Sequence, residues 1–299
     1  MDLKNKFKRY RNKKWFIFLN RLIHNIKEDE ITAIGAQLTY YLILSIFPFL
    51  IFFLNILAYT SITQEGILDN WFIMLPLETE ILLRSIIDEI TNTSSDTLLS
   101  LSIILALWTG SLGISAIIKA INKAYNVEKK RPYIRLKLLS IIFSIALVIL
   151  LLIVLLMLVF GEVIGNTLFS YIGVANIFYR LWEQLRKVIP FVSMIIIFAL
   201  LYKYSVSHNK RTNIKLIYTL PGAAFTTIGW IIASYIFSYY VNNFANYSRT
   251  YGSLGGVIIL LIWLYITSIM IILGGEINGA YFSVFINKEV KSSDEKDDE

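Results

Sequence analysis

Six long apolar runs recur along the chain, each bounded by stretches rich in charged residues. As α-helices, runs of roughly 20 residues cross the ~30 Å hydrocarbon core of a bilayer. The pattern predicts an all-α fold: a polytopic membrane helix bundle with six transmembrane helices, flanked by interfacial amphipathic helices. The predicted spans are about residues 31–59, 98–118, 138–160, 188–204, 217–241 and 255–277.

The segments outside the spans divide the chain into three parts. Residues 1–30 carry nine Lys and Arg with apolar residues at helical spacing, which predicts a basic amphipathic helix on an anionic leaflet. Residues 31–285 form the transmembrane domain, with a second interfacial segment predicted over 161–188 and an acidic surface helix within 61–96. Residues 286–299 are a charged tail for which we expect disorder.

Polar side chains recur at every fourth position of the first and fifth spans, which places them on one helix face. The sixth span follows a tyrosine-rich segment and ends near a carboxylate. Such side chains either line a polar pathway or form hydrogen bonds between helices. The candidate pathway or gate residues are Gln37, Tyr41, Ser45, Trp230, Ser234, Ser238, Tyr247, Tyr251, Ser253, Glu276 and Asn278.

Glu276 is the most unusual of these residues, because an ionisable group within a span usually has a function. It could take up a proton or pair with a substrate ammonium group, or it could reach water or a nearby Lys or Arg. Asn278 could simply cap a helix. Glycines four residues apart predict close helix packing. These glycines are Gly252, Gly256, Gly275 and Gly279.

Composition and charge agree with a membrane protein. The hydrophobic fraction is 56% and the mean hydropathy +0.63, far above the values of a soluble domain. Alternating the six spans places 23 of the 28 Lys and Arg on one side. The positive-inside rule assigns that side and both termini to the cytoplasm. Arg131 and Arg135, just before the third span, could bind an anionic lipid or only determine topology.

The residue inventory argues against several chemistries. The chain has no Cys and only two His, which excludes disulfides and thiolate catalysis and leaves no ligand spacing for zinc. No Walker A glycine loop and no cluster of carboxylates or histidines is present. We therefore expect no enzyme activity, no cofactor and no metal. Expected partners are membrane lipids, including anionic lipid at the cytoplasmic face; no nucleic acid is expected, and a homo-oligomer is compatible with the sequence.

Several motifs in order resemble the YihY/virulence factor BrkB family over most of residues 30–285. The motifs are Leu38–Pro48, Trp108–Tyr125, Pro221–Ala223, Asn246–Ser248, Tyr251–Ser253 and Leu273–Asn278. The resemblance implies an inner-membrane protein of poorly defined activity, connected with virulence, the envelope and proposals of lipid or small-molecule transport. Family members also carried an old label as ribonuclease BN.

Three hypotheses about function follow. The first is a transporter or flippase-like handler of a lipid or amphiphile in envelope homeostasis. The second is a non-transporting envelope scaffold that binds other proteins. The third is a ribonuclease, which the residue inventory supports least.

Overall fold

The computed structural model describes residues 14–59, 96–127, 131–158, 176–207, 214–244 and 254–286. All regular elements in these ranges are helical. Six helices in the described residues are long and apolar enough to cross a membrane. The predicted all-α fold with six spans is therefore confirmed.

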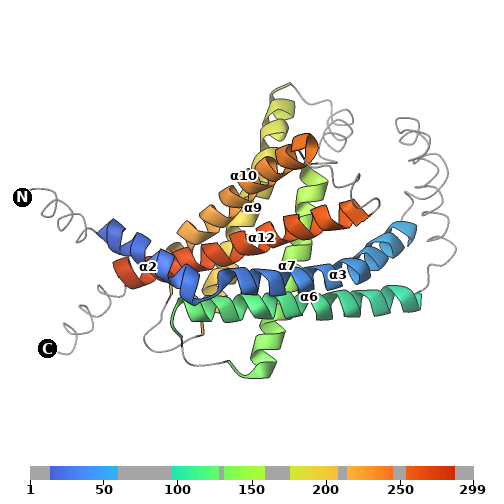
Figure 1. Cartoon of the computed structure of the whole chain (residues 1–299). Helices are drawn as coiled ribbons and strands as arrows, with labels where there is room; N and C mark the ends of the chain where they lie inside the picture. Colours follow the sequence, from blue (N-terminus) through green and yellow to red (C-terminus); the bar gives the residue numbers. More distant parts are fainter. Residues whose placement is uncertain are drawn as a thin grey trace, which may run out of the picture. The chain divides into compact units, whose positions relative to one another are not determined.

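Figure 1 shows the helices in chain order. They are α2 (Lys14–Glu28), α3 (Ile31–Tyr59), α6 (Asp96–Ala124), α7 (Tyr133–Leu158), α9 (Asn176–Ser205), α10 (Leu220–Phe244) and α12 (Leu254–Tyr281). A short 3₁₀ helix, η2 (Leu216–Thr219), leads into α10, and a π-helical turn, η3 (Phe282–Ile286), follows α12.

Helix α9 differs most from the boundaries expected from sequence. It begins at Asn176, well before the expected start of the fourth span at residue 188, and it continues through Pro190. The sequence predicts an interfacial segment over 161–188 from apolar residues at helical spacing; its residues 161–175 lie outside the described residues, and the rest belong to this helix. The charged residues Glu183 and Lys187 of α9 pair at 3.1 Å. Such a pair on one helix face is compatible with a continuous helix, so the charges do not mark a break.

The described residues form two units. One contains the residues up to Thr39 and those from Ile114 onward, and the other contains Tyr40 to Gly113. Within the first unit, α10 packs against α12 and α9, and α7 packs against α9. This unit contains Glu276.

Helices α10 and α12 are in close contact at a point where each has a glycine. A Cβ on Gly222 would overlap the carbonyl oxygen of Gly274, and a Cβ on Gly274 would overlap the Thr226 hydroxyl. The Thr226 hydroxyl is 2.6 Å from that of Tyr202 on α9, which also donates to the carbonyl oxygen of Ile271 at 2.7 Å. Small residues and paired hydroxyls together fix α9, α10 and α12 to one another.

Helix α6 ends in a Schellman motif. Val127 N–H donates to the carbonyl of Asn122, and Asn126 N–H donates to that of Lys123, both at 2.9 Å. Asn126 has φ of 52°, a left-handed conformation that glycine and asparagine tolerate best. The motif stops α6 at Ala124, one residue after Lys123, which leaves that side chain at the helix end.

Candidate functional site

Glu276 is buried on α12, with only 1% of its surface exposed. It lies inside the apolar span Gly255–Ile286. Its carboxylate Oε2 accepts a hydrogen bond from Asn25 Nδ2 of α2 at 3.4 Å, and the carboxyl group of Asp29 is its acidic neighbour. Glu276 therefore has protein partners, contributed by the N-terminal helix, and does not reach water directly.

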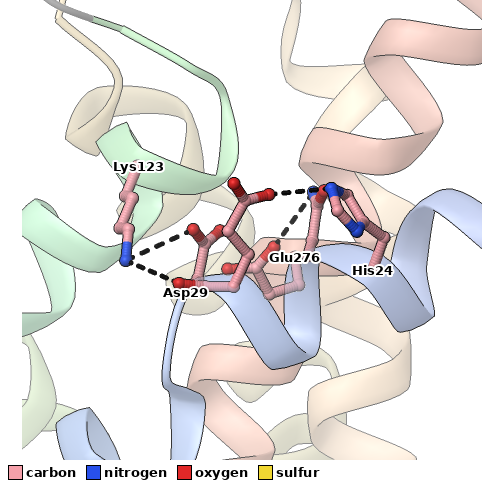
Figure 2. A network of polar contacts seen from close by, with 6 residues as sticks. His24, Asp29, Lys123 and Glu276 are labelled. Atoms are coloured by element: carbon pink, nitrogen blue, oxygen red, sulfur yellow. Dashed lines mark hydrogen bonds and ion pairs between the residues drawn. The ribbon is translucent and has the colours of Figure 1, made fainter.

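Lys123 connects this buried group to the surface. Its ammonium group lies 3.4 Å from Asp29 Oδ1 and donates to the carbonyl oxygen of Glu28 at 3.1 Å. In Figure 2, Asp29 lies between Lys123 and Glu276. Half of the Lys123 side chain is exposed, against 11% of Asp29. We refer to Asn25, Asp29, Lys123 and Glu276 as the α2–α12 polar cluster.

A tight turn between α2 and α3 holds Asp29 in place. Asp29 N–H donates to the carbonyl of Asn25 at 2.8 Å, and the carbonyl of Glu30 accepts from Ala33 and Ile34 at the start of α3. Glu30 has φ of 49°, which is uncommon for a residue other than glycine. The turn therefore joins α2 to α3 through only two residues and fixes Asn25 and Asp29 beside α12.

The face of α2 that meets α12 is mixed in character. Phe18 is buried with Ala280 and Val284, and Leu22 packs against the same cluster. Asn25 and Asp29 continue this face at helical spacing. On the exposed side of the helix, His24 lies 2.8 Å from Glu28.

The chemistry of the polar cluster follows from its charges. Two neighbouring carboxyl groups share one ammonium group, so the ionised cluster has one negative charge in excess. A proton or a cationic group of a substrate would balance that charge. Among the described residues, no group of three or more His, Asp or Glu side chains could hold a metal ion.

Asn278 lies on a different side of α12 from Glu276 and has a separate role. Its Oδ1 accepts from the backbone N–H of Gly222 at 2.8 Å, and its Nδ2 donates to the carbonyl of Thr219 at 3.0 Å. Asn278 thus caps the start of α10, a neighbouring helix. The structure does not bring it together with Glu276.

The candidate residues on α10 form hydrogen bonds to α12. Trp230 Nε1 donates to the Thr267 hydroxyl at 3.0 Å, and Ser234 accepts from Trp263 Nε1 at 3.2 Å. Ser238 instead accepts from Asn242 of its own helix at 3.4 Å. The first two contacts are those expected if the polar row holds helices together.

The candidates on α3 differ in their surroundings. Gln37 is exposed. Tyr41 and Ser45, which are in the other unit, are partly buried, and the Ser45 hydroxyl donates to the carbonyl of Leu42 at 2.7 Å. Tyr247, Tyr251, Ser253 and Gly252 lie outside the described residues.

The remaining glycines of the α12 pattern differ in their surroundings. A Cβ on Gly279 would come within 2.5 Å of the carbonyl oxygen of Ala124, and one on Gly275 within 3.0 Å of Ile121. These two glycines allow α12 to pack closely against the end of α6. A Cβ on Gly256 would meet nothing within 4 Å.

The two candidate lipid-binding arginines also differ. Arg131 donates from one guanidinium nitrogen to the carbonyls of Tyr204 and Val206, at 2.5 and 2.6 Å, and so covers the end of α9. Its partial burial lowers the pKa of the Arg131 guanidinium from its usual value. Arg135 is exposed one helical turn later.

Asn25, Asp29 and Lys123 are the residues of this site that sequence reasoning did not single out. A signal for two of them was present. Asn25 and Asp29 fall on the same helical stripe as Phe18 and Leu22, so a polar pair extends an otherwise apolar face. Lys123 had no such signal, because it lies among many other basic residues in the segment after the second span.

Comparisons with known proteins agree on one family. The family model described as virulence factor BrkB matches residues 22–299. A protein of Bacillus subtilis named putative ribonuclease-like protein YfkH is 40% identical over 278 residues, which cover 93% of this chain and 98% of that protein. A UPF0761 membrane protein of Pseudoalteromonas atlantica is 25% identical over 285 residues, covering 93% and 89% of the two chains. No solved structure matches.

Proposed function

The chain belongs to the virulence factor BrkB family, whose relatives include membrane proteins, and from this premise we propose that it moves a lipid or another amphiphile across the bilayer. The observation that carries the proposal is the burial of Glu276 within an apolar span, next to Asp29 and one half-exposed lysine. Buried ionisable groups in membrane helices commonly mark substrate or proton pathways. Glu276 then acts at the inner mouth of the pathway, where it binds a proton or a cationic head group.

The proposal also includes location and orientation. The chain is a multi-pass membrane protein of the plasma membrane, with both termini and the polar cluster on the cytoplasmic side. The distribution of Lys and Arg between the two sides supports this orientation. A reporter that works only in the cytoplasm should be active when fused after Glu299. Activity of a reporter that works only outside the cytoplasm would contradict the orientation.

Reconstitution tests transport directly. The purified chain is reconstituted in vesicles that contain trace fluorescent phospholipids with zwitterionic, anionic or cationic head groups. A reductant added outside the vesicles bleaches the labelled lipids of the outer leaflet, and the loss of fluorescence is followed over time. We expect the protein to accelerate movement of at least one lipid class. The variant Glu276→Gln retains a hydrogen-bond acceptor for Asn25 but loses the charge, and it should slow this movement by about tenfold, the loss expected from one charge-assisted contact.

A matched control is available on α9. Glu183→Gln removes another glutamate of a membrane helix, but one that is 43% exposed and paired with Lys187 on the same helix. It should transport at the rate of the unmodified chain. No acceleration of any lipid class by the folded protein would reject the proposal and leave an envelope scaffold as the better description.

The name of the Bacillus subtilis relative suggests ribonuclease activity as an alternative function. We do not extend that activity to this chain. A nuclease needs a general base or metal ligands that converge near a phosphate. The polar cluster contains two neighbouring acidic residues, Asp29 and Glu276. Both are buried among helices. RNA cleavage by the purified protein that is lost in Glu276→Gln would overturn this view.

A further inference from the structure

Helix α2 has an exposed apolar face beside the face that packs on α12. Trp15, Leu19 and Ile23 repeat every four residues and are 69%, 52% and 54% exposed. At about 100° per residue, they lie next to the stripe of Phe18 and Leu22, which is covered by α12 and η3. In Figure 1, α2 lies beside the end of α12 that leads to the C-terminus.

The two faces belong to one short rigid element. Phe18 contacts Ala280 and Val284, while the ring of Trp15 lies 5.8 Å from those of Phe18 and Phe285 and remains largely open on its other side. The tight turn at Glu30 then joins α2 to α3 without a flexible linker. A force that orients the exposed face therefore also orients Asn25 and Asp29.

The position and charge of α2 favour a lipid surface as the occupant. The helix ends three residues before Ile31, where a membrane span begins, so it lies close to the boundary between hydrocarbon and water. It carries Lys14, Arg21 and Lys27 against Glu28, and six more Lys and Arg precede it within residues 1–13. An apolar stripe with tryptophan and an excess of basic residues is the combination that binds anionic interfaces.

We propose that the face of α2 formed by Trp15, Leu19 and Ile23 docks into the anionic phospholipid leaflet around the bundle, and that this docking holds Asn25 and Asp29 over Glu276. Binding of the lipid then determines how tightly α2 packs over Glu276. This inference does not require that the protein transports anything, because it concerns only the packing of α2 between lipid and α12.

The 299-residue chain suits a labelling test because its sequence contains no cysteine. Leu19→Cys carries a fluorophore that is quenched by spin-labelled lipid tails, and Asn20→Cys on an exposed, polar position of the same helix is the matched control. Each labelled protein is reconstituted in vesicles of phosphatidylcholine alone or with one quarter phosphatidylglycerol. Quenching at position 19 should rise at least about twofold with the anionic lipid, whereas position 20 should stay unquenched.

Hydrogen exchange in the same vesicles tests the second half of the proposal without changing the buried residues. Anionic lipid should slow amide exchange about threefold or more in both α2 and residues 276–286. The triple variant Trp15→Gln, Leu19→Gln and Ile23→Gln should lose this protection, whereas the double variant Asn20→Ala and His24→Ala should keep it.

Three outcomes would overturn the proposal. Absence of quenching at position 19 in anionic vesicles would show that lipid does not occupy the face. Quenching without any change in amide exchange over residues 276–286 would show that lipid binding does not alter the packing of α2 over Glu276. A dimer in which position 19 is shielded from lipid quencher would instead assign the face to a second copy of the chain.

Discussion

The side-chain amide of Asn25 donates a hydrogen bond at 3.4 Å to the carboxylate of Glu276, 251 positions later in the chain. Both side chains are almost completely buried. The contact joins the first described helix to the last long one, so α2 is a packed part of the bundle at this point. A buried acceptor that loses its donor retains its desolvation penalty.

Replacing Asn25 should therefore destabilise the protein. Asn25→Leu leaves Glu276 without this donor, and we expect a loss of about 1–3 kcal/mol in the free energy of unfolding. Thermal unfolding in detergent can be followed by intrinsic tryptophan fluorescence, since the chain has six Trp. Asn20→Leu makes the same chemical change at an exposed position of α2 and should be nearly neutral. Equal effects of the two variants would show that the contact contributes nothing.

Lys123 should stabilise the cluster through Asp29. Lys123→Met removes the ammonium group 3.4 Å from Asp29, and because half of the lysine side chain is exposed we expect a loss of only about 1 kcal/mol. The double variant with Asp29→Asn should lose less than the sum of the single variants, since the two groups interact. Lys119→Met, at an exposed position one turn earlier on α6, serves as the control. Additive single effects would argue against the ion pair.

The close approach of α10 and α12 predicts a contrast between glycines. Gly222→Ala places a Cβ against the carbonyl oxygen of Gly274, so the helices must move apart, with an expected loss of about 1–3 kcal/mol. Gly256→Ala has nothing within 4 Å and should gain up to about 1 kcal/mol from helix propensity. Thermal unfolding of the two variants measures both effects. A tolerated Gly222→Ala would mean that the interface has more room than its geometry indicates.

The Schellman motif at the end of α6 makes a backbone prediction. Asn126→Gly should keep or slightly raise stability, because glycine adopts φ of 52° without strain. Asn126→Val forces a β-branched residue into the left-handed region and should cost about 1–2 kcal/mol. The comparison uses midpoint temperatures of the two variants under identical conditions. If valine and glycine are equivalent at this position, the end of α6 has a different conformation in the membrane.

The sequence predicts the six spans well because length and apolar composition decide them almost alone. The first span, expected over residues 31–59, agrees with α3 at both ends. The start of α9 was harder to predict, since Glu183 and Lys187 interrupt the apolar pattern without interrupting the helix. Charge near a bilayer boundary is compatible with a surface segment and with the exposed side of a long helix.

The site was less predictable because its partners come from distant segments. The row of Trp230 and Ser234 identifies a polar face, but only the packing of α10 on α12 reveals Thr267 and Trp263 as partners. Glycine spacing is similarly incomplete. Gly279 meets the backbone of Ala124, whereas Gly256, with the same kind of spacing, faces open space in the described part of the chain.

The contact between α2 and α12 also has a consequence for biosynthesis. Ribosomes add about 5–20 residues per second, so roughly 13–50 s pass between the synthesis of Asn25 and that of Glu276. Throughout this interval Phe18, Asn25 and Asp29 have no α12 to cover them. Chains that stop before the last span therefore keep this face of α2 uncovered, because Ala280, Val284 and Glu276 are its partners.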